Sequence, residues 1–424
     1  MVGIIGGGLS GLFVLHGLRS RGVDAVLLEA DERVGGVVRT AHLSEGEAEL
    51  GPARLRLTPA LCDVLDDTGL TGGIRQAPAD ARFHMYREGQ LHPVPLSAAE
   101  ALRTPLISWW GKARTLWDLL SAPPRRDETV EAAVVRKLGP EVYTALVGPL
   151  LGGLYASDPG RMYARHTVLP MLEGLGGGRS LLLGLARARR MGGMPVVSLS
   201  GGMEELPRAL GALHRDRIRT GSPVLDLAAR GAGSFLLRTG EEEIPVRELV
   251  LTVPAQPAAR LLEHLAPEAG RRIQELRYNP LAVIPMEGVL PTGGTGFKVS
   301  MDEALALRGV TSRMGLGGDR PILTAYLGGM GRETLLAQPD DRLADLAARE
   351  YEAVTGETAR PLMVHRTRVP AWDTSWRHLD DLRLPPGIRI CAAWHRRPGV
   401  IGRLAEARSV VGRIVAGANG GAIS

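Results

Sequence analysis

The sequence is poor in cysteine and in aromatic residues. Cys62 and Cys391 are the only cysteines among 424 residues, which excludes a disulfide framework and a cysteine-rich metal centre. So few thiols suit a reducing compartment, and a cytoplasmic protein is expected. The ten histidines are scattered and include no HExxH pair, so no metal site is expected.

The sequence also lacks a long, strongly apolar run. No charge precedes Arg19, but this N-terminal stretch has no basic start, and five of its first eleven residues are glycines. A signal peptide or membrane anchor is therefore not expected there. No other uncharged segment approaches the roughly 20 apolar residues that a membrane-spanning helix needs.

Lysine is scarce as well, although the chain is basic. Only Lys112, Lys137 and Lys298 are lysines among 51 basic residues, and 46 acidic residues leave a net charge of +5. The two signs are interspersed without a basic tail, so we attribute the arginine content to composition bias and expect no nucleic-acid partner. With 44% apolar and 23% charged residues, the chain is typical of a globular protein of two or three domains.

The first 29 residues have the pattern of a nucleotide-binding unit. Residues 2–5 predict a buried strand, residues 12–21 a helix, and residues 23–28 a second strand. The loop between the first strand and the helix reads Gly6-x-Gly8-x-x-Gly11, and the second strand ends at Glu29.

Each part of this motif has a physical role in binding a dinucleotide. Gly6 permits a tight turn, Gly8 lets a pyrophosphate approach the backbone, and Gly11 lets helix and strand pack closely. The free amides at the start of the helix stabilise the phosphate charge. Glu29 is placed to bind ribose hydroxyls and disfavours a 2′-phosphate. The alternative, a structural glycine turn, does not require the acid.

The residues after Glu29 distinguish FAD from NAD. They read EADERVGGVVRT, with Arg33 shortly before Gly35 and Gly36, and Arg39 able to pair with a phosphate. This string resembles the second signature of the amine-oxidase-like FAD superfamily, and the predicted cofactor is FAD. Solvated surface charge is the alternative role for the two arginines.

The remaining chain alternates helical and strand patterns. Residues 97–192 read as helices, with segments at 98–102, 106–120, 129–137 and 140–147. Strands are predicted at 222–227, 234–239, 248–253 and 387–391, and further helices at 257–265, 340–355 and 404–416.

Seven strings, in order along nearly the whole chain, narrow the resemblance. They are ELGPAR at 49–54, YREGQLHPVP at 86–95, TPLIS at 104–108, LGPE at 138–141, PLLGGLYASDP at 149–159, SGGMEELP at 200–207 and TAYLGG at 324–329. In these strings the chain resembles the oxygen-dependent protoporphyrinogen/coproporphyrinogen oxidase family.

The resemblance implies an α/β fold of three interleaved parts. An FAD-binding Rossmann-like domain would take residues 1–75, 200–260 and 365–424. An α+β substrate-binding domain would take residues 76–92 and 261–364, and a helical insertion residues 93–199. In this family the helical part leans on the membrane.

The resemblance also implies site residues, with no catalytic side chain because the flavin carries the chemistry. Cofactor contacts beyond the N-terminal motif would come from Gly51, Pro52, Val224, Ala392 and Val400. The substrate would meet Gly296, Phe297 and Tyr326, and core packing is the alternative for Phe297 and Tyr326. Arg82 is the candidate partner for a substrate carboxylate, since a guanidinium binds a carboxylate bidentately, and a surface arginine is the alternative.

The C-terminal segment departs from the family pattern. Ala392 and Ala407 stand where the family has glycines, and Arg396, Arg397 and Pro398 replace a small, flexible turn. This segment should meet the flavin, so bulk there is expected to shift or weaken flavin binding unless Gly399 and Gly402 serve in a shifted register.

The function implied is oxidation of a porphyrinogen to a porphyrin, with dioxygen as acceptor, in haem biosynthesis. Two alternatives stay open: another FAD oxidase or desaturase of the superfamily with an amine or polyene substrate, and a flavin-poor, non-catalytic relative that binds tetrapyrroles. Trp109, Trp110 and Trp117 lie among basic residues, a composition that suits a lipid interface at the inner face of the cell membrane. A packed helix or a homodimer contact is the alternative.

Overall fold

The computed structural model describes all residues except 79, 171–179, 185–194, 232, 397–398 and 421–424. Its first sheet contains five parallel strands in the order β10 (Ile218–Arg219), β2 (Ala25–Leu28), β1 (Val2–Ile5), β14 (Glu248–Leu251) and β21 (Ile388–Ile390). Strands β1 and β2 are buried along their whole length, as parallel strands covered on both faces must be. The sheet therefore unites the two ends and the middle of the chain, and the predicted α/β fold is confirmed.

Helices and a small sheet cover this parallel sheet. Helix α1 (Leu9–Arg19) packs against α14 (Gly399–Gly420) and α10 (Glu205–Leu213). An antiparallel sheet follows β10 along the chain, with strands β11 (Asp226–Ala229), β12 (Phe235–Arg238) and β13 (Glu243–Val246). Leu237 and Val246 of that sheet reach Gly3 in β1, so the small sheet closes the opposite face.

The second large sheet has eight strands. The order is β19 (Arg360–Pro361), β15 (Tyr278–Glu287), β18 (Ile322–Gly328), β17 (Leu307–Ser312), β16 (Gly296–Val299), β7 (Phe83–Arg87) and β8 (Gln90–Pro93), and β20 (His365–Pro370) pairs with β15. Phe297, Ala325 and Leu327 form one core with α13 (Asp340–Thr355). Because side chains alternate between the faces of a strand, the intervening residues face away from α13.

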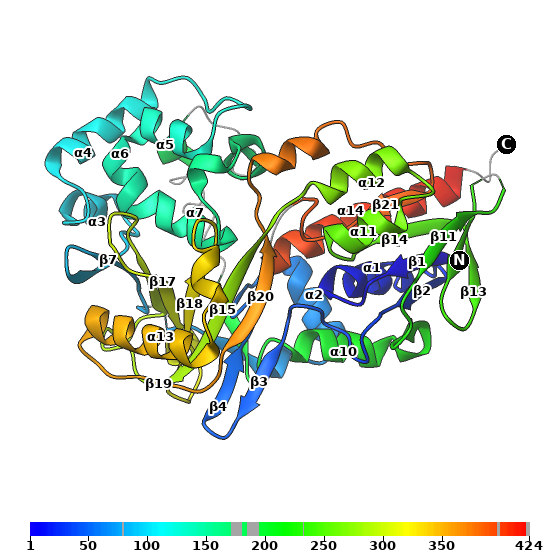
Figure 1. The fold of residues 1–424 in the computed structure, drawn as a ribbon, viewed down its shortest axis with the longest axis horizontal. Helices are drawn as coiled ribbons and strands as arrows, with labels where there is room; N and C mark the ends of the chain where they lie inside the picture. Colours follow the sequence, from blue (N-terminus) through cyan, green and yellow to red (C-terminus); the bar gives the residue numbers. More distant parts are fainter. Residues whose placement is uncertain (79, 171–179, 185–194, 232, 397–398, 421–424) are drawn as a thin grey trace.

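A group of helices lies at the end of this sheet that is remote from the chain termini (Figure 1). It contains α3 (Ala98–Arg103), α4 (Trp109–Thr115), α5 (Val130–Leu138), α6 (Pro140–Val142) and α7 (Gly148–Tyr155). Helix α7 contacts β16 and β17 of the second sheet. The helices thereby border the face of the sheet opposite α13.

Short elements connect these parts. Strands β3 (Thr40–Leu43) and β4 (Gly46–Glu49) form a hairpin, and β9 (Val196–Leu199) pairs with both β5 (Leu55–Arg56) and β6 (Ile74–Gln76). Helix α2 is Pro59–Asp67, α11 is Ala255–Leu261 and α12 is Pro267–Gln274. Within the part of the chain that the structure describes, no helix is both long and apolar enough to cross a membrane.

Several predicted boundaries were wrong. Helix α1 begins at Leu9, three residues before the predicted start, because Gly11 lies inside the helix rather than before it. The predicted helix at 106–120 is shorter, since Ser108 caps it and it tightens into a 3₁₀ turn at Leu116–Leu119. The strand expected at 222–227 is Asp226–Ala229, and the helix expected at 404–416 begins at Gly399.

Candidate cofactor and substrate site

The glycine loop after β1 is built as its sequence predicts. Gly6 has a φ of 110°, a conformation that side-chain-bearing residues rarely adopt. A Cβ atom on Gly11 would lie 2.0 Å from the carbonyl oxygen of Gly6, which no packing adjustment can accommodate. These two glycines are therefore required by the protein's own fold.

Gly8 differs from its neighbours in the loop. It has a φ of −67°, and a Cβ atom there would meet no protein atom within 4 Å. Its backbone forms a parallel bridge with Gly35, and a Cβ on Gly36 would lie 3.4 Å from Gly8 Cα. Two glycine turns thus converge on an open place at the start of α1, where a pyrophosphate fits against free amides.

Glu29 lies at the carboxyl end of β2, next to the glycine loop. Its carboxylate accepts hydrogen bonds from the backbone N–H of Gly7 and, at 3.0 Å, from that of Asp31. These bonds fix the side chain beside the loop, in the position from which a Rossmann acid binds a ribose.

The structure gives Arg33 and Arg39 different surroundings. The Arg33 guanidinium donates to the carbonyl oxygen of Gly36 at 2.9 Å and pairs with Glu204 at 3.4 Å, so it holds the second glycine turn in shape. Arg39 is exposed, and among the described residues it makes no ion pair, which leaves it available to a phosphate.

Gly51, Pro52 and Val224 are the next predicted cofactor contacts along the chain. A Cβ atom on Gly51 would lie 2.1 Å from the carbonyl oxygen of Val37, so this glycine brings two chain segments into close contact. Pro52 is partly buried, and Val224 is a partly buried residue that packs on the core around the parallel sheet.

The C-terminal residues are less open than the N-terminal glycines. Ala392 and Val400 are buried, and the guanidinium of Arg403 donates to the carbonyl oxygen of Ala392. Ala407 is also buried, in the core shared with α1. Arg397 and Pro398 lie outside the described residues. Of the residues that depart from the family pattern, Ala392 and Ala407 are therefore tightly packed, whereas Arg396 is exposed.

The face of the second sheet opposite α13 is polar. Tyr326 and Thr311 lie on it, and their hydroxyl oxygens are 3.1 Å apart. The ammonium of Lys298 lies 5.2 Å from the centre of the Tyr326 ring. The guanidinium of Arg54 lies 5.6 Å from the centre of the Phe83 ring, on the neighbouring strand β7.

Lys298, Arg54 and Arg308 are called the cation cluster below, because both guanidinium groups act on the Lys298 ammonium. Burial, with smaller contributions from Arg54 and Arg308, lowers the pKa of Lys298 to about 8. Burial also lowers the pKa of Arg54 and Arg308 and raises that of Tyr326. Lys298 and Arg308 are partly buried and Arg54 is exposed, so this polar face of the sheet is open to solvent.

Sequence reasoning did not select the cation cluster as a site. Arg54 lies in a string that carried the resemblance, and Lys298 directly follows Gly296 and Phe297, but neither was assigned a role. A usable signal was present: in the segment GFKV, buried Phe297 and Val299 flank a lysine that must face the other side of the strand.

The predicted substrate residues are not all brought together. Tyr326 lies beside Lys298 on the polar face of the sheet. Gly296 has a φ of 142° and lies in close contact with β17. Phe297 is fully buried and stacks on Tyr351 of α13, on the other face of the sheet. Arg82 is half exposed and pairs with Glu100 at 3.5 Å, so it does not join the cation cluster.

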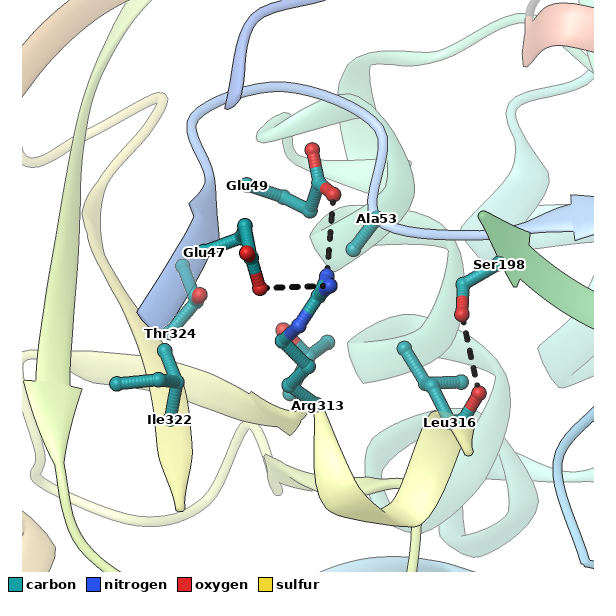
Figure 2. Close-up of a pocket in the computed structure, with 9 residues that line it drawn as sticks. Glu47, Glu49, Ala53, Ser198, Arg313, Leu316, Ile322 and Thr324 are labelled. Atoms are coloured by element: carbon teal, nitrogen blue, oxygen red, sulfur yellow. Dashed lines mark hydrogen bonds and ion pairs between the residues drawn. The ribbon is translucent and has the colours of Figure 1, made fainter. Parts of the chain in front are cut away.

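A polar pocket is lined by Glu47, Glu49 and Arg313, as Figure 2 shows. Thr311, whose hydroxyl oxygen lies 3.1 Å from that of Tyr326, also lines it. Arg313 pairs there with Glu47 at 3.1 Å and with Glu49 at 3.5 Å. Glu49 also accepts hydrogen bonds from the Met203 N–H and the Thr40 hydroxyl, both at 2.9 Å. Burial outweighs these bonds and raises the pKa of Glu49 to about 7. The pocket therefore connects the β3–β4 hairpin with β17 and β18.

Known proteins are similar to this chain in sequence and in fold. Protoporphyrinogen oxidase 1 of Arabidopsis thaliana is 29% identical over 66% of this chain and 57% of its own length. Coproporphyrinogen III oxidase of Mycobacterium leprae is 28% identical over 85% of this chain and 84% of its own length. A crystal structure from Exiguobacterium sp. 255-15, provisionally named a protoporphyrinogen oxidase, is similar with a TM-score of 0.79, 24% identity and coverage of 97% of this chain and 98% of that one.

The family is established by a match over most of the chain. The model of the flavin containing amine oxidoreductases matches residues 9–379. The flavin cofactor of this family suits the open space beside Gly8 and the acid at Glu29. The chain therefore belongs to the flavin-containing amine oxidoreductase family and is an FAD-dependent oxidoreductase.

Proposed function

We propose that the protein oxidises a porphyrinogen to the corresponding porphyrin in haem synthesis, with dioxygen as the electron acceptor. The observation that carries this proposal is the cation cluster at the polar face of the second sheet, in which Lys298 has no carboxylate partner among the described residues. A porphyrinogen is a broad macrocycle with carboxylate side chains, and the named relatives act on such substrates.

Bound FAD would supply the redox chemistry, taking two electrons in each of three rounds. The balance is one porphyrinogen and three dioxygen molecules to one porphyrin and three hydrogen peroxide molecules. The chain's own residues have other tasks. The loops at Gly8 and Gly36 hold the dinucleotide, and the cation cluster orients the macrocycle by its carboxylates. No side chain is required as a catalytic acid or base.

An amine substrate is the main alternative within the family. A protonated amine bound at this face of the sheet would meet Lys298 with Arg54 and Arg308 nearby, and like charges repel. The positive charge of the cation cluster therefore favours a carboxylated substrate over a cationic one.

The proposed reaction is tested by aerobic turnover of the purified holoprotein with coproporphyrinogen III and with protoporphyrinogen IX. We expect porphyrin fluorescence to appear with at least one of them, with three dioxygen molecules consumed and three peroxide molecules formed per porphyrin. Full FAD content without porphyrin formation from either substrate would rule the proposal out. Turnover of amines alone would establish the alternative.

We further propose that the helical part touches a lipid surface peripherally. Trp109, Trp110 and Trp117 are 72%, 87% and 53% exposed, and Leu116 and Leu120 are exposed beside them. The ammonium of Lys112 lies 4.5 Å from the centre of the Trp109 ring. Exposed indoles with nearby cations suit the interface of an anionic bilayer.

Replacing Trp110 and Trp117 together by serine is expected to reduce binding to vesicles of mixed neutral and anionic phospholipid by about tenfold or more, since each indole buries a large apolar surface. Co-sedimentation measures the bound fraction. The matched control replaces Trp372 and Trp376, which stack on each other in the core, by phenylalanine and should leave vesicle binding unchanged in the folded fraction. Equal sedimentation of the serine variant and the wild type would contradict the proposal.

A further inference from the structure

Lys298 lies where three parts of the chain meet. It belongs to β16 of the second sheet, and a Cβ atom on Gly153 of α7 would lie 2.7 Å from its ammonium nitrogen. A Cβ on Gly309 of β17 would lie 2.8 Å from its Cδ atom. Two glycines, one in a helix and one in a strand, therefore leave the space that the lysine side chain occupies.

The charge balance around Lys298 is incomplete. Among the residues that the structure describes, no carboxylate pairs with its ammonium, and Arg54 and Arg308 both destabilise its protonated form. Two acids act on its neighbours: Asp158 stabilises the charge of Arg308, and Glu49 acts on Tyr326. A partly buried lysine beside two guanidinium groups is costly for the fold unless an anion joins it.

The other members of the cluster are held by the protein. The Arg308 guanidinium donates to the carbonyl oxygens of Gly328 at 3.2 Å and Met330 at 3.4 Å. Arg54 rests against Phe83. The two hydrogen bonds fix the Arg308 guanidinium beside Lys298, so an anion would meet a partly prepared site there, while Arg54 is exposed at its edge.

We propose that Lys298, supported by Arg54 and Arg308, binds a carboxylate side chain of the substrate at the polar face of the second sheet. This inference rests on the proposed porphyrinogen oxidation and assigns to Lys298 the partnership expected of Arg82, which is already paired with Glu100. The cluster binds the carboxylate by charge-assisted hydrogen bonds, and the Tyr326 ring covers one side of the ammonium.

The test compares Lys298→Met and Lys298→Arg with the wild-type holoenzyme. The readouts are KM and kcat for coproporphyrinogen III, and the Kd of the unreactive product coproporphyrin from a fluorescence titration. In Lys298→Met, KM and Kd should rise at least about tenfold, because hydrogen bonds between charged groups are stronger than neutral ones. The turnover number should change less, and Lys298→Arg should retain most of the affinity.

A matched control is Arg271→Gln, which also removes one positive charge but from an exposed pair with Glu268 on α12. It should leave KM and Kd unchanged. Unchanged KM and Kd in folded, flavin-loaded Lys298→Met would overturn the inference. A wild type that binds coproporphyrin but oxidises no porphyrinogen would instead contradict the proposed function and leave the subsite tested by the Kd alone.

The pH profile of the wild type gives an independent readout if Lys298→Met fails to fold. The lysine is protonated below its pKa and loses its charge above about pH 8, so KM should rise with pH above that value. Arg54 and Arg308 stay charged, and Tyr326, whose pKa is raised, stays neutral over this range. Glu49 ionises lower, near pH 7. A KM that stays flat between pH 7 and 9 would count against Lys298.

Discussion

Replacing Gly8 by valine should abolish FAD binding while the polypeptide remains folded. A Cβ atom at this position would meet no protein atom within 4 Å, and the φ of −67° is allowed for valine. The space it would fill is the one that a pyrophosphate must reach. We therefore expect the purified variant to lack the flavin absorption bands and to lose activity by at least about a hundredfold, since the chemistry resides in the cofactor.

Two further variants make this result specific. Gly11→Val should fail to fold, because its Cβ would lie 2.0 Å from the Gly6 carbonyl oxygen. Gly240→Val, at an open and exposed loop position, should keep both flavin and fold. A Gly8→Val protein with wild-type flavin content would mean that the dinucleotide does not approach this loop.

Replacing Lys137 by methionine should destabilise the protein by about 3–5 kcal/mol, the effect of leaving one charge of a buried pair alone. The Lys137 ammonium lies 2.9 Å from an Asp118 carboxylate oxygen, and both side chains are fully buried. It also donates to the Ser121 hydroxyl at 2.9 Å. Urea unfolding of the holoprotein measures the change as a lower transition midpoint.

The double variant Asp118→Leu with Lys137→Met removes both charges and should recover most of the lost stability. Lys112→Met is the matched control, since that lysine is only partly buried and donates to a single backbone carbonyl, and it should cost less than about 1 kcal/mol. Equal midpoints for Lys137→Met and Lys112→Met would show that the buried pair contributes no more to stability than a surface lysine.

The N-terminal unit could be predicted because its constraints are local. The turn at Gly6, the close contact at Gly11 and the acid at Glu29 all lie within one strand–helix–strand segment, where spacing determines which atoms meet. Even there the helix starts at Leu9 rather than residue 12, because the third glycine is part of the helix.

The substrate face was harder to predict because its residues meet through strand register and helix packing. Lys298 lies in register with Met85 on one side and Gly309 on the other, and α7 supplies Gly153 from far away in the sequence. Arg82 has the right chemistry for a carboxylate, yet Glu100 on α3 already pairs with it. Such pairings depend on tertiary contacts that a single sequence does not fix.

The most direct test of the account is anaerobic mixing of the FAD-loaded protein with coproporphyrinogen III and, separately, with protoporphyrinogen IX. We predict that at least one of them bleaches the oxidised flavin spectrum, and that admitting air restores the spectrum as porphyrin fluorescence appears. A fully loaded flavin that neither porphyrinogen reduces, while an amine does, would contradict the account.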